Sequence, residues 1–255
     1  YTTDGSEPKA NSRLYSSPVH LDSTTVIRAK TFKLQSLPSK TITNTYFINV
    51  TTDLPVFSLS TDPANFFSDT AGIYVQGTNG ITGYCSSGPR NWNQDWERPV
   101  SLEFYETDKS RAFKVNAGVK IYGGCTRLYP EKSLAVYMRD KYGDSKIRYK
   151  VFKDSYLYEF NNLVLRNAGQ DWYRTMVREG MISSLIKGKM NIDQQEYRPS
   201  ILFINGRYWG IHNIREKLNE HYIEYHYNVQ EADLDLIEYS KVADVSTGDS
   251  VAYYE

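Results

Sequence analysis

The 255-residue sequence has no long hydrophobic run and no excess of charge of either sign. Lys and Arg number 30, as do Asp and Glu, so no overall field would hold DNA or an anionic membrane surface. The longest apolar stretches are strand-sized, well short of the roughly 20 residues that cross a bilayer. We therefore expect no nucleic acid among the partners and no transmembrane segment in this chain.

The short motifs of common hydrolases and zinc proteins are also missing. The sequence contains no Gly-x-Ser-x-Gly, no His-Glu-x-x-His and no zinc-type cysteine spacing. His221 and His226 invite a metal interpretation, but at this spacing they do not share a helix face. We predict no metal site in this chain.

Cysteine is scarce, with only Cys85 and Cys125. Two cysteines suit one disulfide in an exported protein as well as two free thiols in a cytosolic one. Each lies in a Gly/Ser-rich stretch that can approach the other. We expect a bridge between them if the protein is exported.

Tyrosine is abundant, at 22 residues, and its ring suits half-buried strands as well as sugar or peptide contact. Turn residues and short alternating runs indicate strands and no helix in residues 1–49. Later residues predict strands at 54–60 and 133–138, a hairpin over 100–122, and a second hairpin around Asn205-Gly206. Helical spacing predicts a helix from an Asp171 N-cap to Lys187, ended by Gly188, then a helix over 218–227 and a short one after Gln230.

Two resemblances follow from these residues. YTTDGSEP, SRLYSSPVHL and TTVIRAKTF resemble the immunoglobulin-like module at the C-termini of chitobiases and hexosaminidases. Five later pieces resemble, in order, the spore coat protein H (CotH) family: TDPANFF with GIYVQG, VKIYGGCTRLYPEKSLAVYM, LVLRNAGQDWYRTMVRE, DQQEYRP and FINGRYWGIHNIREKLNEHYI. The implied fold class is α+β. A partial β-sandwich at 1–49 and a linker at 50–55 would precede a protein-kinase-like domain at 56–255, present mainly as its small-lobe-like antiparallel sheet plus helix.

The CotH resemblance implies a secreted protein of the extracellular space or cell envelope. Such a protein would transfer phosphate from ATP, with Mg²⁺, to Ser or Thr of proteins at the cell or spore surface. The catalytic and metal-binding acids are expected beyond Glu255, so we expect a fragment that is inactive alone. The alternative is a catalytically silent adhesion or scaffold protein that binds glycan or protein. A weaker one is carbohydrate processing, although no convincing carboxylate pair is present.

Four residues are candidates for nucleotide contact. Lys132 and Arg127 lie in GGCTRLYPEKS, where a glycine pair lets backbone approach a phosphate. The resemblance makes Lys132 the phosphate-binding lysine and Arg127 its helper; two solvated cations in a turn are the alternative. Glu179 would pair with Lys132 as a kinase helix C glutamate does, or be a solvated helix residue. Glu216 would meet the adenine at the hinge, or form a structural ion pair.

Overall fold

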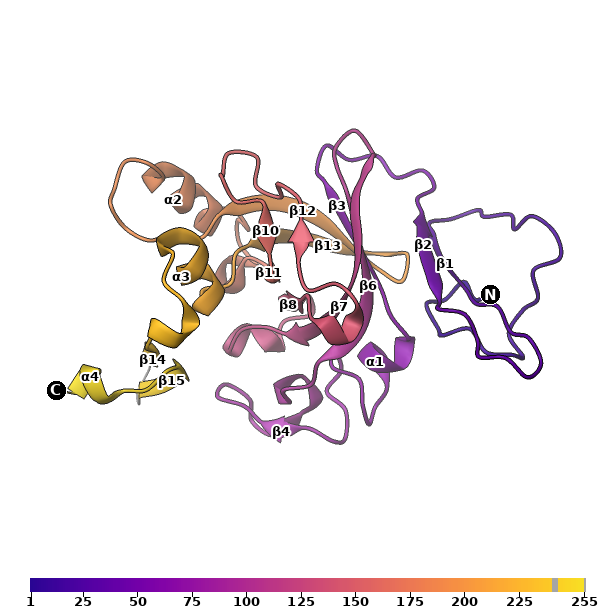
Figure 1. The fold of residues 1–255 in the computed structure, drawn as a ribbon, viewed down its shortest axis with the longest axis horizontal. Helices are drawn as coiled ribbons and strands as arrows, with labels where there is room; N and C mark the ends of the chain where they lie inside the picture. Colours follow the sequence, from indigo (N-terminus) through magenta and orange to yellow (C-terminus); the bar gives the residue numbers. More distant parts are fainter. Residues whose placement is uncertain (240–242, 255) are drawn as a thin grey trace.

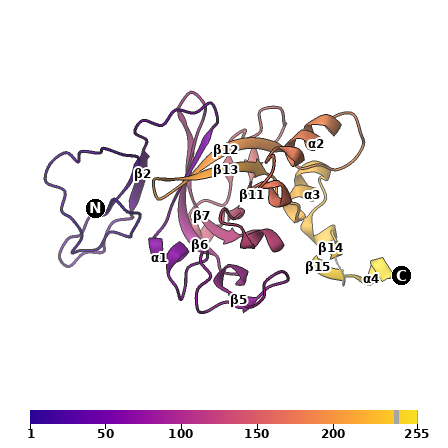
Figure 2. The ribbon, with the colours of Figure 1, turned by 180° about the vertical axis from the view of Figure 1, so that it is seen from behind.

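The computed structural model describes residues 1–239 and 243–254. Figure 1 shows an N-terminal module at the right, a β-barrel in the centre, and helices α2 and α3 with the C-terminal segment at the left. Figure 2 shows the same parts from behind. The mixture of strands and few helices confirms the expected α+β class. No described helix is both long and apolar enough to cross a membrane.

Seven strands form the closed barrel, in the order β11-β13-β12-β3-β6-β7-β8. Their bounds are Val56–Ser60 for β3, Arg98–Tyr105 for β6, Arg111–Ile121 for β7, Leu134–Tyr137 for β8, Asn162–Arg166 for β11, Tyr197–Ile204 for β12 and Arg207–Arg215 for β13. Neighbouring strands are antiparallel except β3 and β12, which run parallel. The sequence predicts an antiparallel sheet, and the structure has a closed barrel in which one pair of strands is parallel.

The local strand predictions agree with this barrel. Residues 54–60 contain β3, the hairpin over 100–122 is β6 and β7, and residues 133–138 contain β8. Asn205 and Gly206 join β12 to β13 with φ values of 49° and 77°, as a tight hairpin turn requires. Strand β11 was not predicted.

The N-terminal module is smaller than the predicted sandwich. Strands β1 (Thr25–Ala29) and β2 (Ile42–Tyr46) form one antiparallel pair, extended by a bridge between Thr2 and Arg28. The described residues 1–49 contain this one sheet, so the predicted partial sandwich is present as a single layer. This sheet covers the outer face of β3, where the Thr45 and Ser58 hydroxyl oxygens lie 2.7 Å apart.

Alternation along the strands separates the barrel core from this covered outer face. Phe57 and Leu59 of β3 point into the core, opposite Phe104 and Leu102 of β6. These four side chains are at most 1% exposed, and burial of such apolar surface is the main stabilising contribution to the fold. The intervening Ser58 and Ser60 are also buried, because the module covers them.

The helices are short and lie mostly beside the barrel. Their bounds are Pro63–Phe67 for α1, Arg178–Ile186 for α2, Glu220–Tyr227 for α3 and Val251–Tyr254 for α4. Helix α3 confirms the prediction at 218–227, whereas only a 3-10 turn, Glu231–Asp233, follows Gln230. Small strand pairs join β4 (Ile81–Thr82) to β5 (Pro89–Arg90), β9 (Ile147–Arg148) to β10 (Glu159–Phe160), and β14 (Leu236–Tyr239) to β15 (Ala243–Thr247).

Helix α2 begins seven residues later than the predicted N-cap, Asp171. Met176 has a φ of 61°, which a continuous helix does not allow. The Asp171 carboxylate nevertheless caps the helix from seven residues earlier in the sequence, because it accepts a hydrogen bond from the Arg178 backbone N–H at 3.2 Å. Gly188 follows the helix with a φ of 69°, as predicted for its C-terminal glycine.

Candidate functional site

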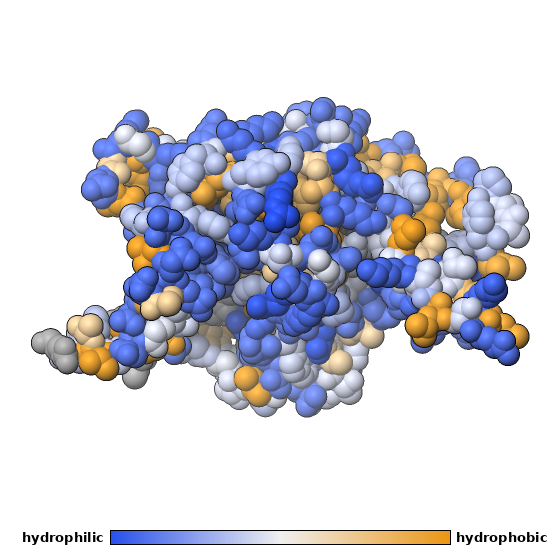
Figure 3. Space-filling view, viewed as in Figure 1, coloured by the Kyte–Doolittle hydropathy of each residue, from blue (hydrophilic) through white to orange (hydrophobic). Residues whose placement is uncertain are grey.

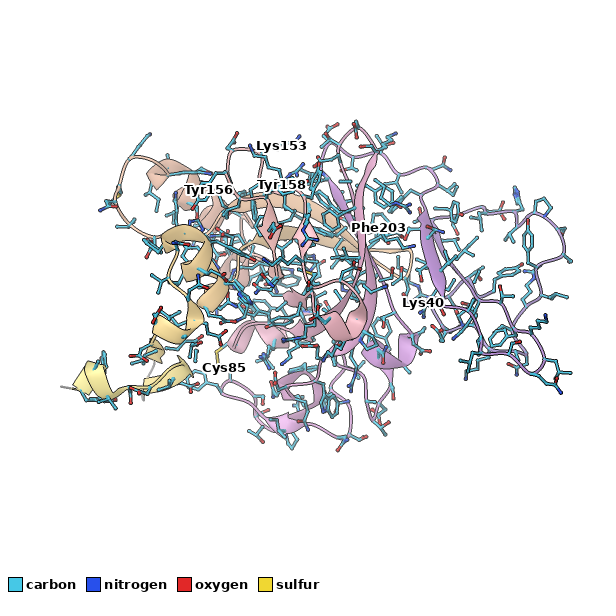
Figure 4. All side chains as sticks on the ribbon, viewed as in Figure 1. Lys40, Cys85, Lys153, Tyr156, Tyr158 and Phe203 are labelled. Atoms are coloured by element: carbon cyan, nitrogen blue, oxygen red, sulfur yellow. A yellow bond between two sulfur atoms is a disulfide. The ribbon has the colours of Figure 1, made fainter. Side chains whose placement is uncertain are left out.

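The loop between β7 and β8 carries the glycine pair of the candidate site. Gly123 has a φ of 96°, a conformation that L side chains rarely adopt, and the 3-10 turn Cys125–Leu128 follows. Cys125 is bonded to Cys85 across a Cα–Cα distance of 4.9 Å, which confirms the expected disulfide. Figure 4 shows this bond beside the labelled Cys85. The disulfide ties the loop to the segment between β4 and β5.

Lys132 is enclosed by aromatic rings rather than exposed on this loop. It is 4% exposed, and its ammonium nitrogen lies 4.2 Å from the centre of the Trp92 ring and 5.3 Å from that of Tyr74. The ammonium donates a hydrogen bond to the Tyr129 carbonyl at 2.7 Å. Burial lowers the pKa of Lys132 to about 8, so the lysine is mostly protonated at neutral pH and held by cation–π contacts.

Arg127 and Lys132 both contact Trp92. Its guanidinium donates hydrogen bonds to the Gly123 carbonyl and, at 3.0 Å, to the Trp92 carbonyl, while Lys132 packs on the ring of the same tryptophan. Burial lowers the pKa of Arg127. In the described part of the chain, neither cation has a carboxylate within ion-pair distance.

Glu179 on α2 pairs with Arg166 at the end of β11, not with Lys132. The Arg166 Nε and Nη2 atoms each donate to one Glu179 oxygen at 2.6 Å, a forked geometry typical of strong ion pairs. The Glu179 pair raises the pKa of Arg166. The LVLR run that ends in Arg166 does not alternate in polarity, so the sequence pattern does not predict this strand.

A second guanidinium approaches the same carboxylate from β13. Arg215 Nη1 lies 3.8 Å from Glu179, and its Nη2 donates to the Ser183 hydroxyl at 3.3 Å. Arg215 is 5% exposed, burial lowers its pKa, and its Nε has no hydrogen-bond partner in the described structure. Two guanidiniums thus share one carboxylate, and the surplus positive charge suits an anion.

The position of Tyr122 connects this charged cluster with the glycine loop. Tyr122 follows β7 directly, immediately before Gly123, and burial raises its pKa while the nearby Arg166 lowers it. The glycine pair and the surplus positive charge therefore belong to one region of the molecule. Chemically, this region offers backbone N–H groups and guanidinium donors, the groups that hold phosphate oxygens.

Glu216 faces α3 instead of an open cleft. It is 4% exposed, one oxygen lies 2.9 Å from His226 Nε2, and the other accepts from the Glu196 backbone N–H at 2.9 Å. Burial raises the pKa of Glu216. Tyr156 extends this row of hydrogen bonds, because its hydroxyl lies 3.0 Å from His226 Nδ1. The alternative of a structural ion pair therefore describes the side chain of Glu216 in this structure.

Comparison with known protein families covers most of the chain. Residues 1–43 match the chitobiase/beta-hexosaminidase C-terminal domain, and residues 119–254 match the CotH kinase protein family. A search of curated proteins finds no match. The glycine loop, Arg166, Glu179 and Arg215 all lie within the second match, and the chain belongs to the CotH kinase protein family.

Proposed function

We propose that this protein is a CotH-type, protein-kinase-like protein that transfers phosphate from ATP to Ser or Thr of surface or coat proteins. The observation that carries the proposal is the Arg166–Glu179 fork with the surplus charge of Arg215. In protein kinases a basic residue on the third strand pairs with a glutamate on the following helix, and this pair positions the nucleotide phosphates. Here β11 directly precedes α2, and β12 and β13 follow, which is the same order.

The fork in this chain uses arginine where a kinase uses lysine. Arg166 gives Nε and Nη2 to Glu179, and its Nη1 has no hydrogen-bond partner within the described residues. That Nη1 is the donor we assign to phosphate oxygens, and the nearby charge of Arg215 adds to the attraction for the phosphate.

The other candidates take supporting places in this proposal. The loop at 122–133 would cover the phosphates, with Arg127 and Lys132 as the cations that shape it and supply positive charge. Glu216, after the last barrel strand, would stand at the hinge beside the adenine. Magnesium would accompany the nucleotide. Among described residues no group of three His, Cys, Asp or Glu side chains can hold a metal ion, so we assign no residue to it and derive no step through it.

The disulfide supports a location outside the cytoplasm for the protein. A structural disulfide is typical of oxidising compartments, so the Cys85–Cys125 bridge favours an extracellular or cell-envelope protein. Its partners would then be protein substrates at the cell or spore surface.

The proposal is tested by isothermal titration of the purified chain with ATP in the presence of magnesium. Arg166→Met should weaken ATP binding at least about tenfold, because it removes a charge-assisted contact to phosphate. Lys132→Met should weaken it less, because the ammonium is enclosed by Trp92 and Tyr74. Arg148→Met is the matched control, since Arg148 is exposed and pairs only with Glu159 in the described structure.

Each outcome of the titration separates the candidate functions. Unchanged affinity in a folded Arg166→Met protein would remove Arg166 from the site. A larger loss in Lys132→Met than in Arg166→Met would return the phosphate-binding role to Lys132. A chain that binds no ATP would favour the silent adhesion or scaffold protein.

A further inference from the structure

Helix α2 presents its small and polar side chains to the barrel and its apolar side chains to solvent. Gly180 is its only buried residue, and it packs against the ring of Tyr197. Glu179 and Ser183 on the same side contact the arginines at the ends of β11 and β13. A surface helix normally turns its apolar stripe towards the core and its polar face towards solvent. In α2 this order is reversed, so the apolar stripe serves no packing within the barrel.

The outward stripe is a continuous row. Val177, Met181 and Leu185 are spaced four residues apart, so they lie along one side of the helix, and they are 53%, 54% and 58% exposed. Ile182 beside this row is 49% exposed, and Met190 in the turn after the helix is 57% exposed. Figure 3 shows hydrophobic residues gathered over α2 at the upper left, whereas the surface over the barrel is mostly hydrophilic. These five residues form the α2 surface, and exposed apolar side chains gathered in this way are typical of interaction sites.

Methionine is concentrated at this surface. The chain has four methionines, and three of them, Met176, Met181 and Met190, lie within or beside α2. The methionine side chain is unbranched and polarisable, so it adapts to irregular shapes and is over-used at protein-binding surfaces. The residue types therefore favour contact with another protein.

The exposed charges around the α2 surface are positive. Segment 172–192 contains four exposed cations, Arg174, Arg178, Lys187 and Lys189. Its one acid is Glu179, which binds Arg166 and Arg215. Two of the cations have carboxylate partners in Asp171 and Glu196, whereas Arg174 and Lys189 form no ion pair in the described part of the chain. The α2 surface thus attracts an acidic partner, and a second copy of it would bring like charges together.

We infer that the α2 surface binds an acidic amphipathic helix of a partner protein. Such a helix would lay its apolar side chains along the row of Val177, Met181 and Leu185, and its carboxylates would pair with the unpaired cations at the two ends of the row. A lipid surface fits less well, because Arg178 lies on the same face as Leu185, seven residues later. A bilayer would have to bury or displace that charge, whereas a partner carboxylate can pair with it.

The experiment is a selection of binders to the purified 255-residue chain from a display library of helical peptides of about 18 residues, which is five helical turns. The selected peptides should carry apolar residues at helical spacing and an excess of Asp and Glu. Fluorescence polarisation then measures the affinity of the strongest peptide for variants of the chain.

Met181→Ser with Leu185→Ser should weaken this peptide at least about tenfold, because two apolar contacts at the centre of the row are lost. Arg174→Glu with Lys189→Glu should weaken it about three- to tenfold and reduce the salt dependence of binding. Leu34→Ser with Leu37→Ser is the matched control, since these leucines of the N-terminal module are 89% and 94% exposed, and it should bind normally.

Folding does not obscure the result. Met181 and Leu185 are more than half exposed, so the melting temperature of their serine variant should stay within about 4 °C of the parent chain. A selection that yields no binder overturns the inference, as does a basic peptide or one whose affinity the Met181→Ser, Leu185→Ser variant leaves unchanged. Binding to phosphatidylserine vesicles, or dimerisation, that this variant abolishes would assign the surface to a membrane or to a second copy instead. None of these outcomes depends on ATP binding.

Discussion

Lys132 and His212 are two buried basic residues in contact just before β8. The His212 Nε2 lies 3.2 Å from the backbone carbonyl of Lys132. The sequence makes Lys132 a candidate for phosphate contact, and lysine is almost never fully buried unless it is paired. The structure places both residues where water is excluded, and this burial lowers the pKa of each. Residue type alone could not reveal this, because the rings that enclose Lys132 come from Tyr74 and Trp92, far away in the sequence.

His212 makes the stability of the protein depend on acid. It is fully buried, and desolvation lowers its pKa from 6.5 to about 4. The folded state therefore binds fewer protons than the unfolded state between these values. Its contribution is fully present above about pH 6.5 and is lost as the pH falls toward about 4, with a limit of about 3 kcal/mol.

His212→Gln should flatten the pH dependence of the free energy of unfolding between pH 6.5 and 4, measured by urea denaturation at several pH values. Glutamine keeps a donor for the Lys132 carbonyl but does not titrate. His20→Gln is the control, because the His20 side chain is 86% exposed. An equally steep dependence in His212→Gln would assign the acid sensitivity to another group.

At the scale of elements, helix α2 shows how packing overrides local preference. Gly180 is the third residue of this helix, and glycine within a helix is less favourable than alanine by up to about 1 kcal/mol. The reason is the ring of Tyr197 on β12, which lies where a Cβ atom on Gly180 would be. The glycine lets the helix approach the barrel closely enough to place Glu179 against Arg166.

Gly180→Ala should therefore destabilise the protein by about 1 to 3 kcal/mol, the usual cost of overpacking, despite the better helix propensity of alanine. Chemical denaturation measures this change. Met181→Ala, at a neighbouring position that is 54% exposed, should change stability far less. If Gly180→Ala were as stable as the parent chain, the contact with Tyr197 would not limit the approach of α2.

The elements that the sequence predicted are those whose signal is local. The Asn205-Gly206 turn and the alternating strands on both sides of it need only neighbouring residues, and they were predicted correctly. Strand β11 was missed because NLVLR is a short buried run without alternation or a turn signal of its own. The sequence pairs Glu179 with Lys132 only through the resemblance to kinases, and the strand that carries its partner Arg166 has no signal of its own.

At the scale of the whole molecule, barrel closure lay beyond sequence reasoning. Strand β3 pairs with β12 in parallel, so Val56 lies beside Ile201 although most of the barrel separates them in sequence. Periodicity reports which face of a strand is buried, but it does not report which distant strand covers its edge. The same limit concealed the cavity between the module and the barrel, whose walls come from two regions that each look like ordinary polar strands.

A buried carboxylate, Glu103 on β6, joins the module to the barrel. Glu103 is 0% exposed, and its Oε2 accepts hydrogen bonds from the Thr45 backbone N–H at 2.8 Å and from the Thr45 hydroxyl at 2.7 Å. Its Oε1 accepts from Arg111 at 2.9 Å and from the Tyr105 hydroxyl at 3.1 Å. Lys114 on β7 adds a hydrogen bond to the Thr43 carbonyl.

Glu103→Ala should release the module from the barrel. The substitution leaves the Thr45 N–H buried and unpaired, and breaking such a buried charged network costs about 3 to 5 kcal/mol. Hydrogen–deuterium exchange should show faster exchange of the β2 amides, while the amides of β6 and β7 near the hairpin centre stay protected.

Glu159→Ala is the control, because Glu159 is partly exposed and its ion pairs with Lys146 and Arg148 lie on the surface of the barrel. Equal protection of β2 in both variants would mean that the module is held by its other contacts. If β2 is released, the cavity between the module and the barrel loses one wall, although no residue that lines it has changed.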